Sequence, residues 1–141
     1  MCKLWAATII HAWFRYGALV KLSELANATG RTSEGGKLAV SAQRLRDGIN
    51  AIMYNETLGR YCDGPCADVQ HTAFHASMFS LFNGIVPPDR AAGVFKWIKD
   101  RGMVCSVYGA WGYLQALYKV GPRMGGGSLN LAVAASVSAV R

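Results

Sequence analysis

The chain has 141 residues, of which 52% are apolar and 16% are charged, and its formal net charge is +7. This length is that of a single domain and is sufficient to bury a core. The Lys and Arg residues are scattered, and no acidic residue follows Asp100. Because the positive charge comes partly from this shortage of acids, we expect a basic surface and no nucleic-acid partner.

Two amphipathic helices are predicted in the first part of the chain. The first spans about 7–28 and stops near Gly30, and the second spans roughly 34–54 after the capping residues Thr32 and Ser33. The expected core of the first helix is Ile9, Trp13, Tyr16, Val20 and Leu25. The polar face of the second helix carries Lys37, Arg44, Arg46 and Asp47. The second helix is therefore expected to be an outer, more exposed member of the pair.

Turn-forming residues interrupt the helical pattern between 55 and 70. They include Asn55, Gly59, the run Asp63-Gly64-Pro65, and Asp68. Connections of this length in a compact domain are commonly functional, so this segment is predicted to be a functional loop.

Three further helices are predicted between 71 and 121. The first begins at His71 and stops at Gly84, the second opens at Asp89, and the third spans about 106–120. The residues expected to share one face of the first of these are His71, Phe74, His75, Met78, Leu81 and Phe82. The third is apolar almost all round, which favours burial on most sides. The predicted order is therefore inner, outer and inner helix.

The junction before the last helix has the specific sequence RGMVCSVYGA, from Arg101 to Ala110. Together with His75-Ala76, the run Gly84 to Pro87 and the run Leu114 to Tyr118, it resembles the catalytic domain of bacterial α-L-rhamnosidases. The resemblance covers about 10–121. It implies an all-α fold whose helical hairpins form part of a six-hairpin α/α barrel. Because a complete barrel is far larger than this chain, it also implies a fragment.

Such enzymes hydrolyse terminal α-L-rhamnose with inversion, which requires two carboxyl groups roughly 6.5–9.5 Å apart. In the family, an acidic motif upstream supplies the acid and a tryptophan-flanked Glu downstream supplies the base; neither motif is present here. The remaining candidates, Glu56, Asp63 and Asp68, lack a paired setting. We therefore assign no catalytic residue and no cofactor, and we expect the chain to be inactive alone.

Four side chains are predicted to bind substrate. Consecutive helices joined by short loops run antiparallel, so the helices that begin near 7, 71 and 106 start at the same end of the layer. That end gathers His71 and His75 with Tyr108 and Trp111. Aromatic faces and hydrogen-bonding groups suit a sugar ring, so the expected partner is a rhamnose-containing carbohydrate. The competing interpretation is that Tyr108 and Trp111 belong to the core.

An alternative constellation is Cys62, Cys66, His71 and His75. Two His residues at i and i+4 on one helix face form a usable metal pair, and the two Cys residues lie just before them. The spacing is shorter than that of finger-type sites. The alternative function is a small basic helical module that binds zinc or nucleic acid.

The remaining expectations concern organisation. Residues 1–121 are predicted to be one domain, and 122–141 a Gly/Ser spacer and an apolar low-complexity tail outside the fold. No apolar stretch reaches the ~18 residues of a membrane span, and no signal peptide is evident, so we expect a cytoplasmic protein without a membrane partner. An incomplete helical layer leaves apolar surface exposed, which predicts self-association.

Overall fold

The computed structural model describes residues 3–69 and 71–121, and the described residues are predominantly α-helical, which confirms the all-α class. The elements are α1 (Lys3–Ala28), α2 (Thr32–Ile52), β1 (Tyr54–Asn55), β2 (Arg60–Tyr61), α3 (Phe74–Phe82), α4 (Pro88–Arg101) and α5 (Val107–Val120). The predicted spacer and tail lie outside the described residues, as does the side chain of Ile9. None of the helices described is long and apolar enough to cross a membrane.

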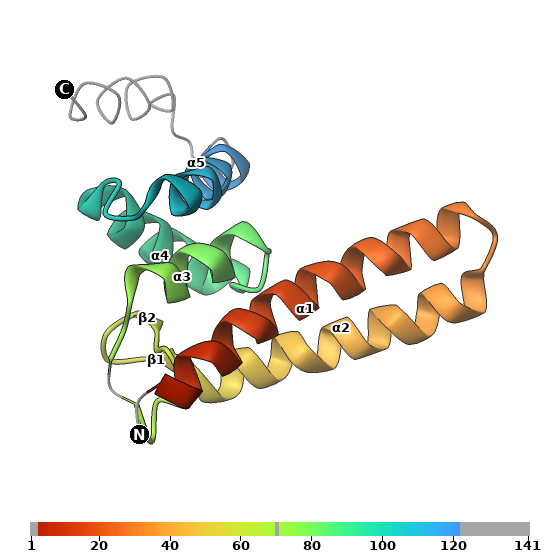
Figure 1. The fold of residues 1–141 in the computed structure, drawn as a ribbon, viewed down its shortest axis with the longest axis horizontal. Coiled ribbons are helices and arrows are strands. Elements are labelled where there is room, and N and C mark those ends of the chain that lie inside the picture. Colours follow the sequence, from red (N-terminus) through yellow and green to blue (C-terminus); the bar gives the residue numbers. More distant parts are fainter. Residues whose placement is uncertain (1–2, 70, 122–141) are drawn as a thin grey trace.

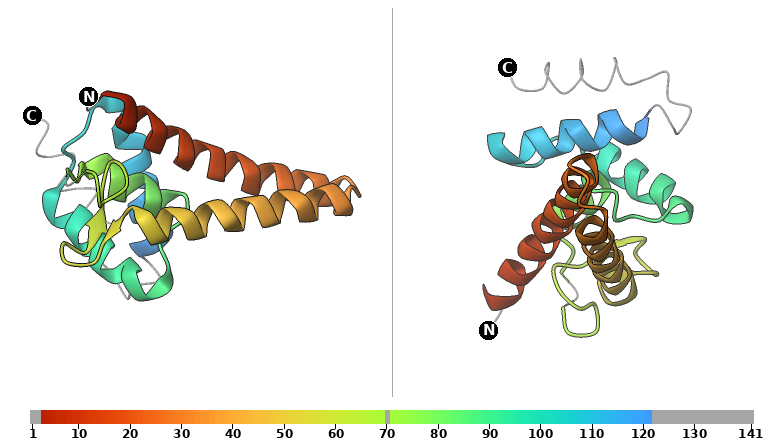
Figure 2. Two further views of the ribbon diagram at one scale, coloured as in Figure 1. Left: turned by 90° about the horizontal axis from the view of Figure 1, so that it is seen from below. Right: turned by 90° about the vertical axis from the view of Figure 1, so that its right-hand side faces the viewer.

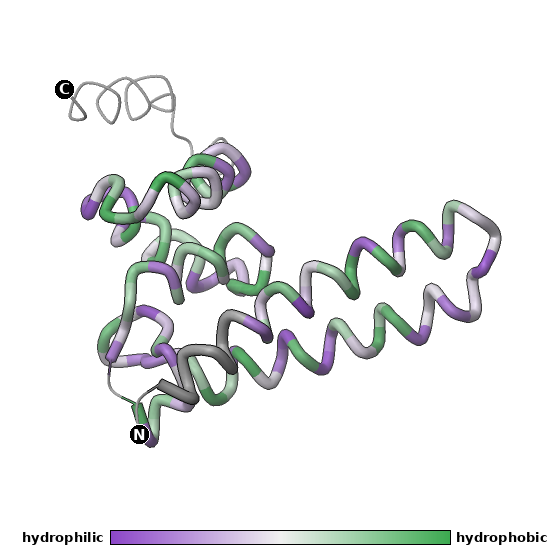
Figure 3. Tube along the Cα trace, viewed as in Figure 1, coloured by the Kyte–Doolittle hydropathy of each residue, from purple (hydrophilic) through white to green (hydrophobic). Residues whose placement is uncertain are grey.

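Helices α1 and α2 form a long hairpin that projects away from the other elements (Figure 1). Gly30 turns the chain with a φ of 79°, and the hydroxyl of Ser23 donates to the carbonyl of Gly35 over 2.8 Å. Hydrophilic and hydrophobic residues alternate along α2 and along the coloured part of α1 (Figure 3). Trp13 is buried near the base of the hairpin, but Leu25 is 60% exposed. The prediction of Leu25 as core is wrong, because this part of the hairpin extends beyond the helices that would cover it.

Helix α3 is the centre of the core and contacts α1, α4 and α5. Most of its side chains are buried, namely Phe74, Ala76, Ser77, Met78, Ser80 and Leu81. The ring of Trp13 stacks on Phe79 with centroids 5.8 Å apart, which joins α1 to α3. The prediction that this helix is an inner one is confirmed, although it begins at Phe74 rather than at His71.

Helices α1, α3 and α5 run in the same general direction, as predicted (Figure 2). In each pair of neighbouring helices, contacts closer to the carboxyl end of one helix are also closer to the carboxyl end of the other. They are Trp13 with Phe79 and Gly17 with Asn83 for α1 and α3, and His75 with Gly109 and Phe82 with Lys119 for α3 and α5. The amino-terminal ends of α3 and α5 therefore lie at the same end of the fold.

Helices α4 and α5 begin and end close to the predicted positions. Pro88 occupies the first turn of α4, and Gly102, with a φ of 67°, follows its last residue. The hydroxyl of Ser106 then accepts from the backbone N–H of Gly109 and caps α5. These stops produce two helices joined by a short connection.

Helix α5 differs from the prediction because it is buried on one face only. The buried residues are Gly109, Gly112, Tyr113, Ala116 and Leu117. On the other face Tyr108 is 92% exposed and Trp111 is 56% exposed. The expectation of burial all round is wrong for α5, since none of the described elements covers that face. Helix α4 buries only Val94 and Ile98, in agreement with its predicted outer location. Helix α2 buries three positions, but the described part of α1 also buries only three, so the predicted difference in burial within this pair is not found.

Candidate functional site

The predicted loop between α2 and α3 is an ordered connection built on a small hairpin. β1 and β2 pair antiparallel, with Tyr54 opposite Tyr61 and Asn55 opposite Arg60. The side chain of Asn55 accepts from the N–H of Leu58 over 2.9 Å, and this local bond closes the turn. The turn residues in this segment agree with the predicted loop, whereas the two short strands were not predicted.

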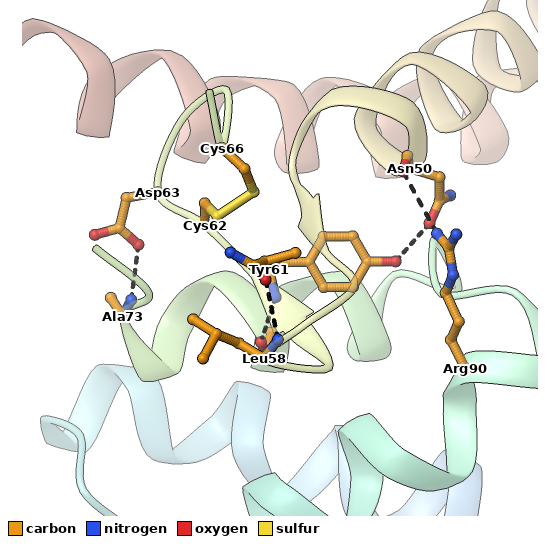
Figure 4. The surroundings of a disulfide bond; sticks show 10 residues. Asn50, Leu58, Tyr61, Cys62, Asp63, Cys66, Ala73 and Arg90 are labelled. Carbon is orange, nitrogen blue, oxygen red and sulfur yellow. Dashed lines mark hydrogen bonds between the residues drawn. A yellow bond between two sulfur atoms is a disulfide. The ribbon is translucent and has the colours of Figure 1, made fainter. Parts of the chain in front are cut away.

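Tyr61 anchors this hairpin in the core. Its side chain is fully buried, and its hydroxyl donates to Oδ1 of Asn50 on α2 over 2.5 Å (Figure 4). Its backbone N–H donates to the hydroxyl of Ser77 on α3 over 3.1 Å. Burial raises the pKa of the Tyr61 phenol well above its ordinary value, and the nearby Arg90 opposes this only in part. Tyr61 therefore ties α2, the hairpin and α3 together as a neutral side chain.

A disulfide between Cys62 and Cys66 follows the hairpin (Figure 4). The N–H of Cys62 donates to the carbonyl of Met53, and the N–H of Cys66 donates to the carbonyl of Ile52, both over 2.8 Å. Carbonyls at a helix carboxyl end have no partner within the helix and must find one elsewhere. The disulfide loop thus completes the end of α2.

Asp63 links the disulfide loop to the start of α3. Oδ1 of Asp63 accepts from the N–H of Ala73 over 3.0 Å, and Oδ2 forms a short contact with Nδ1 of His71. The backbone N–H of Asp63 also donates to the carbonyl of His71 over 3.0 Å. These bonds hold residues 71–73 in an extended approach to the helix. The prediction that His71 and His75 share one helix face is therefore wrong, because α3 begins at Phe74.

The two other candidate carboxylates lie on the outside of the connection. Glu56 is exposed and forms an ion pair with Arg90, whose guanidinium lies 4.1 Å from the centroid of the Tyr54 ring. Asp68 is exposed beyond the disulfide loop. Glu56 is bound to Arg90 and Asp63 is bound to Ala73, so these two carboxylates have structural partners and are not arranged as an acid–base pair.

His75 lies half-buried where α3 and α5 approach each other. A Cβ built at Gly109 would be 3.2 Å from Nε2 of His75 and 2.9 Å from Cβ of Cys105. A Cβ at Gly112 would be 3.0 Å from the ring of Phe79. Glycine at these two positions lets the helices pack closely, and His75 is held in the seam between them.

The four predicted substrate-binding residues are only partly brought together. His75 lies in the seam with α5, whereas His71 is exposed beside Asp63. Tyr108 projects into solvent from the first turn of α5, and Trp111 packs edge-on against Phe82 with centroids 4.9 Å apart. The first turn of α5 therefore approaches His75 through Gly109, Trp111 lies against the other end of α3, and His71 belongs to the disulfide loop. The interpretation of Tyr108 and Trp111 as core residues is wrong because both are exposed.

Two of the four residues expected to bind a metal in the alternative site cannot act as ligands. Zinc binds Cys as the thiolate, and the disulfide occupies the sulfurs of both Cys62 and Cys66. His71 is engaged with Asp63. In the described part of the chain, no three His, Cys, Asp or Glu side chains are grouped so that they could hold a metal ion.

Sequence reasoning missed Tyr61 and its partners Asn50 and Ser77. One signal was available: the adjacent Tyr61 and Cys62 form an apolar pair inside a segment otherwise rich in turn residues, and both are fully buried. Their long-range partners on α2 and α3 carry no comparable signal.

No protein-family model, curated protein or solved structure shows a significant match to this chain.

Proposed function

We propose that this chain is part of the catalytic domain of a glycoside hydrolase of the α-L-rhamnosidase type and forms a section of the wall of an α/α barrel. The observation that carries the proposal is the junction from Arg101 to Ala110. Its sequence resembles that family, and in the fold it places Gly109 against His75, another residue of the resemblance. Two separate parts of the resemblance therefore meet in the seam between α3 and α5.

The exposure of α5 supports an incomplete barrel. The outward face of this helix is aromatic and aliphatic, with Val107, Tyr108 and Tyr118 among its most exposed side chains. Large apolar side chains at neighbouring positions of one helix face are costly to leave in water and are typical of a contact surface. In an α/α barrel the next inner helix would pack on this face.

The chemistry available to the described residues supports binding rather than hydrolysis. Inverting hydrolysis needs one carboxylic acid and one carboxylate on opposite sides of the sugar. Glu56 and Asp63 are instead engaged with Arg90 and Ala73. His75 and Tyr108 can contact a sugar, but contacts that do not strengthen in the transition state add little to the rate. The chain is therefore proposed to supply one wall of a sugar site and no catalytic pair.

Titration of the 15N-labelled chain with L-rhamnose, followed by NMR, tests the proposal. We expect weak binding, with shifts confined to the amides around His75 and the first turn of α5. His75→Ala and Tyr108→Ala should reduce the shifts, whereas Leu25→Ala on the exposed part of α1 should not. Equal shifts with D-glucose, or no shifts around His75, would contradict the proposed sugar site.

A further inference from the structure

An open cavity lies at the carboxyl end of α3, away from the disulfide loop. It has a volume of about 610 Å³ and is lined by α2, the end of α3, the connection between α3 and α4, the first turn of α4 and the last turn of α5. Arg46 of α2 and Lys119 of α5 contribute to its wall. The cavity is thus formed by helices from both halves of the described chain.

The charges around this cavity are all of one sign. Arg46 and Lys119 are the only charged residues among those that the structure places in the lining, and no Asp or Glu is present there. Nε of Arg46 donates to the carbonyl of Ile85 over 3.1 Å, and Nζ of Lys119 donates to the carbonyl of Phe82 over 3.2 Å. These bonds orient the two cations on the α3–α4 connection. Backbone carbonyls carry no formal charge, so the positive charge of the pair is not neutralised by them.

Lys119 is an exposed residue whose ammonium lies 4.2 Å from the centroid of the Phe82 ring. Partial burial lowers the pKa of Lys119, and the positive charge of Lys21 on α1 lowers it further. The carboxylate of Glu24, which pairs with Lys21, lies on the exposed surface of α1. An anion in the cavity would offset both the desolvation of Lys119 and its repulsion by Lys21.

The rest of the wall is mainly apolar. Phe82 is the last residue of α3, Val86 comes from the α3–α4 connection, Ala91 from α4 and Val120 from α5. Ligand sites of this size commonly combine an apolar lining with a few polar groups that fix orientation. A fully hydrated inorganic ion would leave this apolar surface without a partner, whereas an organic anion would cover it.

We propose that this cavity binds a small amphipathic anion, with a carboxylate or phosphate monoester between Arg46 and Lys119 and an apolar group against Phe82 and Val86. The guanidinium offers a planar set of donors that matches two oxygens of either group, and the ammonium adds a point charge. This site is independent of the proposed sugar site, because neither His75 nor Tyr108 lines the cavity.

Isothermal titration of the full chain with four probes at constant ionic strength tests the proposal. The probes are benzoate, phenyl phosphate, inorganic phosphate and the neutral benzyl alcohol. We expect benzoate or phenyl phosphate to bind at least ~10-fold more tightly than benzyl alcohol, because hydrogen bonds to charged groups are the stronger ones. The ratio between the benzoate and phenyl phosphate affinities identifies which head group the site prefers. Inorganic phosphate should bind more weakly than phenyl phosphate.

Substitutions of the two cations in the cavity test whether the probes bind there. Lys119→Met and Arg46→Gln should each weaken the preferred probe by at least ~10-fold, and Lys119→Arg, which keeps the charge, should retain most of the affinity. The matched controls Lys96→Met and Arg44→Gln remove a positive charge elsewhere on α4 and α2 and should leave the affinity within about twofold, since screened surface charges act weakly. Circular dichroism and thermal unfolding show whether each variant is folded.

Three results would overturn the proposal. They are equal affinity for benzyl alcohol, equal weakening by the control variants, and the absence of binding at millimolar probe concentrations. If Lys119→Met does not fold, the comparison of Lys119→Arg and Arg46→Gln with the native chain decides between a defined site and a diffuse positive surface.

Discussion

Nε2 of His75 lies so close to Gly109 that a Cβ at position 109 would be 3.2 Å from it. The same Cβ would be 2.9 Å from Cβ of Cys105, which precedes the α5 cap. Contacts this short require a shift of one helix or of the side chains between them. The close packing of α3 and α5 therefore depends on the absence of a side chain at this position.

Gly109→Ala is expected to lower the free energy of unfolding by about 1–3 kcal/mol, because an additional methyl group overpacks the seam. Gly93→Ala is the matched control on α4, where a Cβ would have no atom within 4 Å. That variant should raise stability by up to ~1 kcal/mol, since Ala is the better helix former. Urea unfolding of both variants measures the difference. Equal effects of the two substitutions would show that the α3–α5 seam tolerates a side chain.

Tyr61→Phe is expected to lower stability by about 1–2 kcal/mol at neutral pH, because it leaves Oδ1 of Asn50 without its donor. Tyr54→Phe serves as the control, since the Tyr54 ring contacts Arg90 and Tyr61 through its faces and edges rather than through its hydroxyl. This control should change stability by less than about 0.5 kcal/mol. Urea unfolding provides the measurement. Equal losses of stability in the two variants would show that the bond from the Tyr61 hydroxyl to Asn50 does not stabilise the fold.

Alkaline pH should reduce the contribution of Tyr61. Its pKa is raised in the folded state by burial, so the unfolded chain releases the phenolic proton more readily. The stabilisation is fully present below the ordinary tyrosine pKa of about 10 and is lost as pH rises above it, by at most ~1.4 kcal/mol per pH unit. The stability difference between the native chain and Tyr61→Phe, measured from pH 8 upward, should therefore shrink above about pH 10. A stability difference that stays constant above about pH 10 would show that the pKa of Tyr61 is the same in the folded and unfolded chain.

Reduction of the disulfide between Cys62 and Cys66 should lower stability by about 2 kcal/mol, the value expected for closing so short a loop. The loss should occur on addition of a dithiol reductant and should be reproduced by the Cys62→Ser/Cys66→Ser double variant without reductant. Cys105→Ser keeps the disulfide and should respond to the reductant as the native chain does. Thermal unfolding with and without reductant measures this effect. Stoichiometric zinc bound by the oxidised chain would contradict the disulfide as the resting arrangement.

Self-association of the isolated chain should occur through the exposed face of α5. Sedimentation velocity over a range of concentrations should show association that the Tyr108→Glu/Tyr118→Glu double variant reduces. The control Leu22→Glu/Val40→Glu makes the same change of charge at exposed apolar positions of the α1–α2 hairpin. If both double variants reduce association equally, net charge rather than the α5 face controls it.

The order of the helices could be predicted because their ends carry local signals. Gly30 and Gly102, both with positive φ, follow the ends of α1 and α4, and Pro88 opens α4. The start of α3 could not be predicted in the same way. Asp63, which is distant in sequence, holds His71 and Ala73 in an extended segment, and periodicity alone extends the helix to His71.

The candidate site was predicted less completely than the fold. Proximity of His75 to the start of α5 follows from the common direction of the helices, and the structure confirms it through Gly109. The exposure of Tyr108 and Trp111 did not follow from composition, because an apolar sequence does not reveal whether a partner surface is present. The bond between Tyr61 and Asn50 joins two segments without any periodic relation, so only the folded arrangement shows it.

The most direct measurement of the central claim is hydrolysis of an aryl α-L-rhamnoside by the purified chain. The Glu56→Gln, Asp63→Asn and Asp68→Asn variants are assayed in parallel to detect a contaminating host enzyme. We expect no release of the aryl group above the blank, because general acid and base groups contribute roughly 10²–10⁴-fold each, and Glu56 and Asp63 are held by Arg90 and Ala73. Turnover by the native chain that one of the three substitutions abolishes would identify a catalytic carboxylate and contradict the account.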